Sequence, residues 1–364
     1  MNGTELESQK KFSFEVVDEG ESLARPSLLA KPLNMKKQVL AEFDAEFVAE
    51  QKKRNDARFE LGRSSGVDVA DSLLNVRALM KEKEFQLAHD LLRAILKIDS
   101  SNEMAIRGVA ECARQLGQHE EAIKILKRLV ATHATAANYL LLADEFYGLE
   151  YNDEAQKAYL QALVLGVSDE TILFHIYKNL GNVQLRLGDL NGAEESYNKA
   201  YTIDSESDAL LANYGSLELY RGDMERSLAR FREAVSYNDR NDKAWVGLSM
   251  IHRQYGDVEL AWANLEKALD INCDNESGIR LLCDWAMKDM EIDRALRYTD
   301  RFLQVHPDHA LISMWHAKFL YFSGRLEAAL VEIEKTLYLD PMLEGATDVL
   351  NVIQDELAKR RAND

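Results

Sequence analysis

The chain has 364 residues, of which 46% are hydrophobic and 29% charged, with 18 glycines and only 4 prolines. This composition is typical of an ordered protein, excludes a collagen-like or largely disordered chain, and favours helix. Lysine and arginine number 44 against 62 aspartates and glutamates, which gives a net charge of -18. That charge disfavours binding to nucleic acid or to anionic membrane surfaces.

The three cysteines, Cys112, Cys273 and Cys283, are odd in number and are never spaced as C-x-x-C. They predict neither a disulfide framework nor a zinc site, and they favour a reducing compartment. The N-terminus has no apolar run of the kind a signal peptide needs, and no stretch approaches 18 consecutive apolar residues. We therefore expect a cytoplasmic protein that does not insert into membranes.

The first part of the chain divides by composition into segments. Residues 1–34 contain the alternating pattern FSFEVV followed by two prolines, which predicts an extended, mobile segment. Residues 35–61 predict an amphipathic helix, because Leu40, Phe43 and Phe47 follow one face of a highly charged stretch. This apolar face has two interpretations, a cap over the helices that follow or a surface that binds another chain.

Residues 62–68, GRSSGVD, predict a linker. Beyond them a small residue recurs at a nearly constant interval of about 34 residues, with one irregular junction between Ala155 and Ala193. The recurring residues are Ala88, Ala122, Ala155, Ala193, Ser227, Ala261, Ala295 and Ala329. The sequence therefore contains eight repeated units.

Each unit predicts a helical hairpin, because apolar residues recur at i, i+3, i+4 and i+7 on both sides of a turn that usually contains glycine. A glycine such as Gly256 supplies the left-handed residue that ends the first helix. The small residue five positions later allows the second helix to approach the first closely. Pro307 and Pro341, which are separated by the same interval, stand where second helices stop.

These features resemble the tetratricopeptide repeat family, whose period is about 34 residues. The sixth unit carries the pattern clearly, with Trp245, Leu248, Gly256, Ala261, Leu265 and Ala268. The resemblance implies an all-α protein, a right-handed superhelical solenoid of eight hairpins over residues 69–341. Met290, Thr299 and Ser313 depart from the pattern in the last two units, and terminal repeats are usually atypical.

Two segments differ from the regular repeats. Residues 342–360 predict a capping helix, since they place a stripe of apolar residues opposite a charged face. The stripe comprises Leu343, Ala346, Leu350, Ile353 and Leu357. The long junction at residues 163–171 predicts either a division of the solenoid into three and five units or a longer loop without that consequence.

Catalytic chemistry is not indicated by any motif in the sequence. It contains no phosphate-binding G-x-x-x-x-G-K-[ST], no G-x-G-x-x-G, no H-E-x-x-H and no G-x-S-x-G. His306 and His309 form an H-x-x-H pair, but two ligands do not make a metal site, so we interpret them as surface histidines. We expect a non-catalytic protein without a metal or cofactor.

In this family the first helix of each unit lines a concave surface, so the resemblance implies a binding groove there. Eleven of its 48 expected positions are basic: Arg77, Lys81, Arg107, Arg114, Lys178, Arg186, Lys243, Arg253, Arg280, Lys288 and Lys318. Three are acidic: Glu111, Asp144 and Asp284. A basic groove on an acidic chain predicts an acidic or carboxylate-bearing peptide partner. Helix C-termini also favour cations, which explains five of the eleven without any ligand.

The C-terminal part of the same surface is apolar. Its residues include Met250, Leu281, Met287, Met314, Trp315, Tyr321 and Phe322. Methionine and aromatic side chains suit an adaptable pocket for a partner helix. Alternatively, neighbouring repeats and the capping helix cover this face.

Units four to six carry a second resemblance. Lys178, Asn182, Asn213 and Lys243 have a spacing similar to that of the two-carboxylate clamp in tetratricopeptide co-chaperones, which grips the C-terminal carboxylate and last acidic side chain of heat-shock chaperones. The resemblance implies that the asparagines hydrogen-bond the peptide while the lysines make charge-assisted contacts. The clamp expects arginine where this chain has Gly247, which puts the second carboxylate contact in doubt.

Arg253 or Arg186 is expected to reach in and supply that missing contact. The candidate peptide-binding residues are Lys178, Asn179, Asn182, Arg186, Asn213, Lys243 and Arg253. We predict a non-catalytic adaptor or chaperone that binds an acidic or C-terminal peptide, or an amphipathic helix, of a partner protein. The alternative is a structural scaffold, a homo-oligomer that self-associates through residues 35–61.

Overall fold

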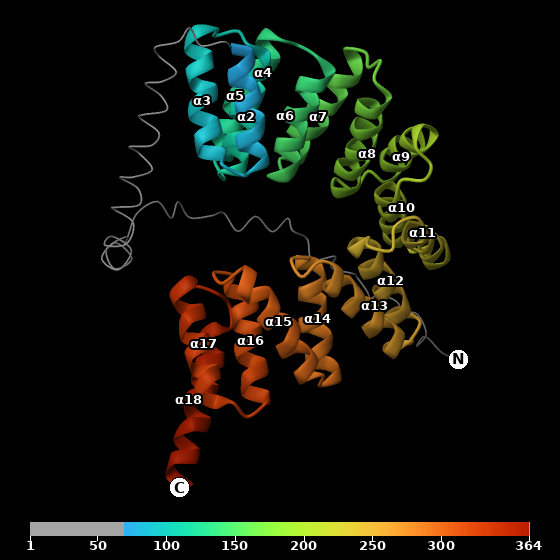
Figure 1. The fold of residues 1–364 in the computed structure, drawn as a ribbon. Helices are drawn as coiled ribbons and strands as arrows, with labels where there is room; N and C mark the ends of the chain where they lie inside the picture. Colours follow the sequence, from blue (N-terminus) through green and yellow to red (C-terminus); the bar gives the residue numbers. More distant parts are fainter. Residues whose placement is uncertain (1–68, 364) are drawn as a thin grey trace. The chain divides into compact units, whose positions relative to one another are not determined.

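The computed structural model describes residues 69–363, which form 17 α-helices and no strand (Figure 1). The predictions for residues 1–34, 35–61 and 62–68 lie outside the described residues. The helices are α2 (Val69–Lys81), α3 (Phe85–Ile98), α4 (Glu103–Gln115), α5 (His119–Thr132), α6 (Ala136–Gly148), α7 (Asn152–Val164), α8 (Glu170–Arg186), α9 (Leu190–Ile203), α10 (Asp208–Tyr220), α11 (Met224–Tyr237), α12 (Asp242–Gln254), α13 (Val258–Ile271), α14 (Glu276–Asp289), α15 (Ile292–Val305), α16 (Ala310–Phe322), α17 (Leu326–Leu339) and α18 (Ala346–Asn363).

The helices pair into eight hairpins, α2 with α3 through α16 with α17, so the predicted all-α repeat fold is confirmed (Figure 1). They belong to two compact units, Met1–Gly166 and Val167–Asp364. The boundary between the units falls within the long junction at residues 163–171. The described part of the first unit holds three hairpins. The second unit holds five hairpins and α18.

Helix α18 closes the second unit. It begins at Ala346, after Gly345 turns the chain with a φ of +78°, and packs against α17 and α16. Ala346, Ile353 and Leu357 of the predicted stripe are buried in the core of the last hairpins. The capping helix is therefore confirmed, with its start four residues later than predicted. None of the helices in residues 69–363 combines the length and apolarity needed to cross a membrane.

Close approach within the hairpins depends on the recurring small residue. All eight are fully buried at 0% exposure: Ala88, Ala122, Ala155, Ala193, Ser227, Ala261, Ala295 and Ala329. Ser227, the one polar member, donates its hydroxyl to the carbonyl of Gly215 on the facing helix at 2.7 Å. Its burial therefore leaves no unsatisfied hydroxyl.

Aromatic rings of the second helices fill the space beside first-helix glycines. Phe231 on α11 is 2% exposed and lies against both Gly215 of its own hairpin and Gly247 of the next. A Cβ atom added at Gly215 would lie 2.6 Å from this ring, and one added at Gly247 would lie 2.3 Å from it. Phe231 therefore locks two successive hairpins together, and neither glycine has room for a side chain.

The turn between the two helices of each hairpin contains a left-handed residue. Five hairpins place glycine there, at Gly117, Gly188, Gly222, Gly256 and Gly324. The other three place Lys83, Glu150 and Met290, with φ of 59°, 62° and 58°. Met290, one of the predicted departures from the repeat pattern, therefore keeps the turn geometry at a cost in backbone strain.

We expect Met290→Gly to raise the free energy of unfolding of the second unit by about 1 kcal/mol, because glycine adopts positive φ without steric cost. Met290 is 60% exposed, so little packing is lost. The reverse change at the equivalent turn, Gly324→Ala, should lower stability by a similar amount. Urea unfolding curves of both variants test this, and a destabilised Met290→Gly variant would contradict it.

Successive hairpins are joined by asparagine bridges, in which the loop before a first helix donates to the start of the preceding first helix. Asn238 and Asn241 both donate to Asp208 at 2.8 Å. Asn272 and Asn275 donate in the same way to Asp242, at 2.7 and 2.8 Å. Asn241 and Asn275 also accept from backbone N–H groups as N-caps, at Ala244 and Gly278 respectively. One side chain therefore both starts a helix and ties it to its neighbour.

The H-x-x-H pair takes the place of these asparagines before α16. The Nδ1 atom of His309 accepts from the N–H of Ile312 at 3.3 Å, while its Nε2 lies 3.4 Å from Glu276. His306 lies 3.3 Å from Asp274. The two histidines therefore connect hairpins rather than converge on a shared point, and no cluster of metal-ligating residues occurs in the described part of the chain.

Candidate peptide-binding surface

The predicted clamp residues lie on consecutive first helices of the second unit. Lys178 and Asn182 belong to α8, Asn213 to α10 and Lys243 to α12. Helix α10 contacts both α8 and α12. Helix α10 therefore lies between α8 and α12, and the predicted clamp residues lie on three adjacent first helices.

Asn182 is oriented by the second helix of its own hairpin. The hydroxyl of Tyr197 on α9 donates to Asn182 Oδ1 at 2.8 Å. Tyr197 is fully buried, and its ring lies where a side chain on Gly181 would otherwise stand. Because the amide oxygen is occupied, the Nδ2 group of Asn182 is left as a hydrogen-bond donor at a half-buried position.

The other clamp residues differ in burial and in the contacts that they make within the protein. Lys178 is half-buried, with its ammonium 5.7 Å from the centre of the Phe174 ring. Lys243 is exposed and forms no ion pair with another described residue. The half-buried Asn213 side chain makes no hydrogen bond within the described part of the chain. Lys243 and Asn213 are therefore available to a ligand.

Arg253 is paired with residues of the next hairpin. Its guanidinium forms a two-point ion pair with Asp289 of α14, at 2.5 and 2.7 Å, and lies 4.9 Å from the centre of the Trp285 ring. Trp262 Nε1 donates to the same carboxylate at 2.8 Å. The hydrogen bonds from Arg253, followed by that from Trp262, hold the pKa of Asp289 below its usual value. This placement assigns Arg253 to the packing of adjacent hairpins and counts against the predicted peptide contact.

The remaining two predicted residues lie on α8. Asn179 is half-buried, and Arg186, the last residue of the helix, is exposed. Gly247, where the clamp expects arginine, is buried against Phe231 and does not reach the surface. The full two-carboxylate arrangement is therefore absent at this point of α12, and Lys243 is the cation that this helix offers.

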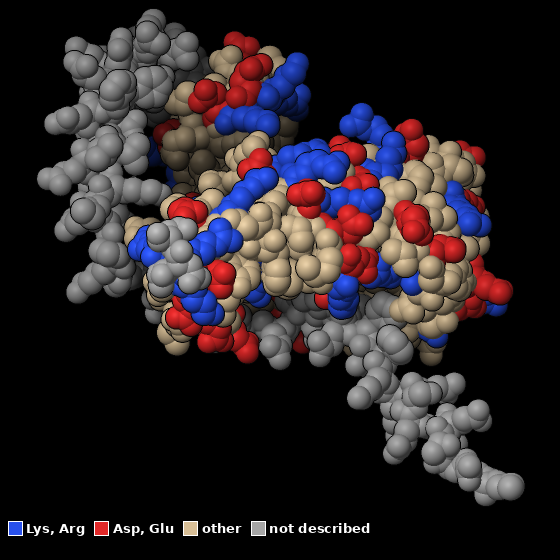
Figure 2. Space-filling model, turned by 90° about the horizontal axis from the view of Figure 1, so that it is seen from below, with Lys and Arg blue, Asp and Glu red and all other residues tan. Residues whose placement is uncertain are grey.

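The excess of cations on the first helices is partly neutralised by the chain's own carboxylates. Among the described residues, five of the eleven basic side chains form ion pairs with neighbouring carboxylates at 2.5–2.7 Å, namely Arg107 with Glu103, Arg114 with Glu111, Arg253 with Asp289, Arg280 with Glu276 and Lys288 with Asp284. Figure 2 likewise shows lysine and arginine interleaved with aspartate and glutamate on the face in view. Much of the positive charge of the first helices is therefore balanced locally by carboxylates.

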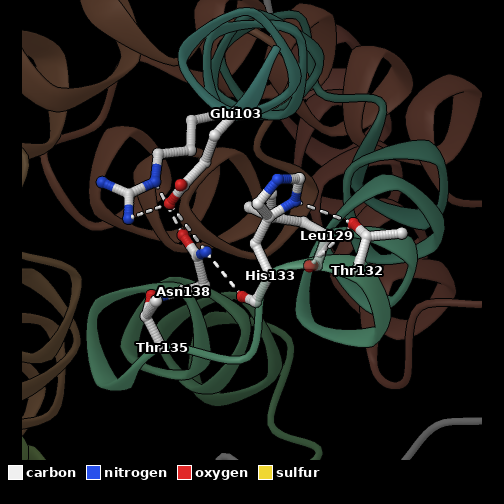
Figure 3. A network of polar contacts seen from close by, with 7 residues as sticks. Glu103, Leu129, Thr132, His133, Thr135 and Asn138 are labelled. Carbon is white, nitrogen blue, oxygen red and sulfur yellow. Dashed lines mark hydrogen bonds and ion pairs between the residues drawn. The ribbon is translucent and has the colours of Figure 1, made fainter. Parts of the chain in front are cut away.

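In the first unit, Arg107 takes part in a polar network around the buried Asn138, and Figure 3 shows this network with Glu103, His133 and Asn138 labelled. Asn138 of α6 is 0% exposed and accepts from Arg107 Nε at 2.6 Å. Its amide nitrogen donates to Glu103 at 3.0 Å and to the carbonyl of His133 at 2.8 Å. Every polar group of Asn138 is satisfied, so the network fixes the start of α6 against α4.

One carboxylate near the first-helix surface, Glu145, was not assigned to that surface by the sequence pattern. A cavity of about 210 Å³ between α4, α5 and α6 is lined by Arg107 and Arg114 together with Glu111, Asp144 and Glu145. Glu145 is 4% exposed and lies 2.8 Å from His119 Nδ1. The helical pattern assigns position 145 to the hydrophobic core, where a carboxylate is not expected. The one signal for Glu145 is its contact with His119 on the preceding second helix, which the sequence alone does not show.

The predicted apolar face lies on α12, α14 and α16 and is only partly accessible. Phe322 is exposed, Met314 is buried at 5% exposure, and the others are half-buried: Met250, Leu281, Met287, Trp315 and Tyr321. Trp315 stacks on Phe319, and the ammonium of Lys318 lies 4.4 Å from the Trp315 ring centre. Burial lowers the pKa of Lys318, which forms no ion pair with a described residue. Met314 is therefore core, Phe322 is exposed, and the remaining residues of this face are partly accessible.

Within each unit, helical hairpins that stack in sequence order and contact their neighbours define a solenoid repeat. Sequence profiles of the tetratricopeptide repeat match residues 79–144, 174–207 and 215–275. The chain is a tetratricopeptide repeat protein. Repeats of this family bind protein partners and are typically non-catalytic, so the fold is that of a protein-interaction adaptor.

Several solved structures are similar to this chain at low sequence identity. A tetratricopeptide repeat protein from Parabacteroides merdae is 14% identical with a TM-score of 0.51, over 78% of this chain and 98% of that one. PilF of Pseudomonas aeruginosa is 20% identical with a TM-score of 0.46, over 61% and 97%. The Cut9–Hcn1 hetero-tetramer of the APC/C is 14% identical with a TM-score of 0.47, and the match covers 81% of this chain but about half, 51%, of that one. No curated protein matches the sequence significantly.

Proposed function

We propose that the chain is a non-catalytic adaptor whose second unit binds the acidic C-terminal segment of a partner protein along α8, α10 and α12. The observation that carries the proposal is the Asn182 side chain, which Tyr197 holds with its amide donor unused. Asn213 and Lys243 on the next two first helices supply a second amide and an uncompensated cation. Two amides and a lysine are suited to a peptide carbonyl and a terminal carboxylate.

The proposed contact is a single-carboxylate version of the co-chaperone clamp. Gly247 removes the expected arginine, and Asp289 occupies Arg253, so Lys243 stands as the one exposed cation of α12 on this path. Binding would then depend on one carboxylate at the peptide terminus more than on an acidic side chain. This favours recognition of a chain end over recognition of an internal acidic motif.

An acidic pentapeptide with a free C-terminal carboxylate tests the proposal against its amidated twin. We expect the full-length protein to bind the free acid at least about tenfold more tightly, because one charge-assisted hydrogen bond is lost on amidation. Affinity should fall as salt rises. Equal affinity for the two peptides in fluorescence anisotropy would end the C-terminal proposal and leave a groove for internal motifs.

Lys243→Ala should weaken binding of the free-acid peptide by about 1.5–3 kcal/mol, the usual cost of a hydrogen bond to a charged group. The matched control is Lys267→Ala on the second helix α13, which removes another exposed lysine away from the first helices. The control should bind like the parent protein. Equal losses in both variants would indicate a general effect of net charge and contradict a site at Lys243.

Tyr197→Phe should weaken the same peptide by about 1 kcal/mol, since Asn182 would lose the hydrogen bond that orients its amide. The aromatic ring beside Gly181 is retained, so the hairpin keeps its packing. Tyr159→Phe, which removes the equivalent hydroxyl donated to Asp144 at 2.5 Å in the first unit, is the control. Unchanged peptide affinity in Tyr197→Phe would remove Asn182 from the site.

A further inference from the structure

The first unit has a groove between its second helices α3 and α5. This groove is a different place from the candidate peptide-binding surface on α8, α10 and α12. It is a cavity of about 300 Å³ lined by residues of α3, α4 and α5. Its floor is formed by Leu96, Ile106, Val109 and Ile125. We call it the α3–α5 groove. An apolar floor open on one side is suited to apolar anchors from another segment.

Three cations, Arg93, Lys97 and Arg128, stand at the edge of the α3–α5 groove. Arg93 is hydrogen-bonded to Glu121, whereas Lys97 and Arg128 form no ion pair with another described residue. Asp99, at the end of α3, accepts hydrogen bonds from Ser101 and Asn102 and forms no ion pair with Lys97 or Arg128. The groove therefore combines apolar surface with two uncompensated positive charges.

The two helices that border the groove carry more cations than carboxylates, whereas the chain as a whole is acidic. Helices α3 and α5 carry five cations, Arg93, Lys97, Lys124, Lys127 and Arg128. They carry three acidic residues, Asp90, Glu120 and Glu121. In a chain of net charge -18 such a face favours an acidic segment over a basic one.

Residues 39–50, VLAEFDAEFVAE, have the matching composition, with four acidic residues and no cation. Leu40, Phe43 and Phe47 stand at i, i+3 and i+7, the spacing by which an amphipathic helix anchors in a groove. The 18 residues that separate Glu50 from Val69 can span up to roughly 60 Å. Since α2 packs directly on α3, that reach includes the groove.

We propose that residues 39–50 dock as an amphipathic helix into the α3–α5 groove of the same chain. Phe43 and Phe47 would contact the apolar floor, and the acidic side chains would lie against Lys97 and Arg128. The short tether raises the effective concentration of the segment, which favours the groove of its own chain over that of a second copy. Docking of this kind would cover the apolar face of the segment without self-association.

Zero-length coupling of lysine to carboxylate in the full-length protein tests the contact directly. We expect carbodiimide to join Lys97 to an acidic residue of 39–50, and mass spectrometry of a mixture of ¹⁴N- and ¹⁵N-labelled protein to find the linked peptides within one isotopic label. Mixed-label peptides would mean that a second copy occupies the groove. That result, or coupling of residues 39–50 only to other lysines, would overturn the proposal.

Hydrogen exchange provides the second test. The double variant Lys97→Gln/Arg128→Gln should speed exchange of residues 39–50 about tenfold, because the docked helix loses its charge contacts. Phe43→Ala/Phe47→Ala, which leaves the described hairpins untouched, should do the same. Lys124→Gln removes a cation of α5 that does not line the groove and should have no effect. Equal exchange rates in all of these proteins would refute docking.

Discussion

Gly247→Arg is expected to destabilise the second unit instead of completing a two-carboxylate clamp. A Cβ atom at this position would lie 2.3, 2.4 and 2.5 Å from three carbons of the Phe231 ring, closer than carbon atoms can approach. Phe231 cannot withdraw, because Gly215 lies against it as well and the ring is 2% exposed. Gly247→Ala alone should cost at least about 2 kcal/mol of unfolding free energy, and arginine more.

The cost can be assigned to the ring by a double-mutant cycle. Phe231→Leu should destabilise the parent protein but partly rescue Gly247→Ala, since the smaller side chain vacates the space that the new Cβ needs. Gly148→Ala is the control, because a Cβ atom there meets nothing within 4 Å and alanine favours helix. Urea unfolding measures all of these proteins. A Gly247→Ala variant as stable as Gly148→Ala would show that α12 moves aside without cost.

The repeat architecture could be predicted because each of its rules acts within one hairpin. A buried small residue and a left-handed turn recur at a fixed interval, and apolar periodicity identifies both helices. The structure keeps that turn even where glycine is absent, at Lys83, Glu150 and Met290. Hairpin packing at these sites outweighs the local preference of the residue, so the interval predicts the turn better than the residue type does.

The candidate site was less predictable, because its properties depend on contacts between hairpins. The spacing of Lys178, Asn182, Asn213 and Lys243 places them on consecutive first helices, which follows from the period alone. It does not reveal that Tyr197, on the second helix of the same hairpin, orients Asn182. Nor does a count of cations reveal which are paired, since the partner of a first-helix cation lies one turn away or on the next hairpin.

Gly247 is a second residue whose role depends on contacts between hairpins. Comparison with the clamp motif shows only that Gly247 stands where arginine is expected. The neighbouring sequence does not indicate that Gly247 is needed for packing. The role comes from Phe231, which lies on α11 and belongs to the preceding hairpin. A missing functional residue can therefore be a structural requirement, which only the packing between hairpins identifies.

Asp289→Ala is expected to lower the free energy of unfolding of the second unit by about 2–3 kcal/mol at neutral pH. The carboxylate accepts two hydrogen bonds from Arg253 and one from Trp262, and both members of the ion pair are roughly one-fifth exposed. Removing it leaves the arginine charge and the indole N–H partly buried without their acceptor. The control is Asp284→Ala on the same helix, whose ion pair with Lys288 is half-exposed or more and should contribute less than about 1 kcal/mol.

The pH dependence separates the charge contribution from packing. Because the folded-state pKa of Asp289 lies below its unfolded value of about 3.9, its stabilisation is fully present above that value and is lost as pH falls through the folded pKa. The difference in unfolding free energy between the parent protein and Asp289→Ala should therefore be constant from about pH 7 to pH 5 and shrink below about pH 4. Urea unfolding across this range tests it, with Asp289→Asn as the variant that keeps the shape but not the charge. A difference that persists unchanged into acid would assign the stabilisation to packing of the side chain and not to its ion pair with Arg253.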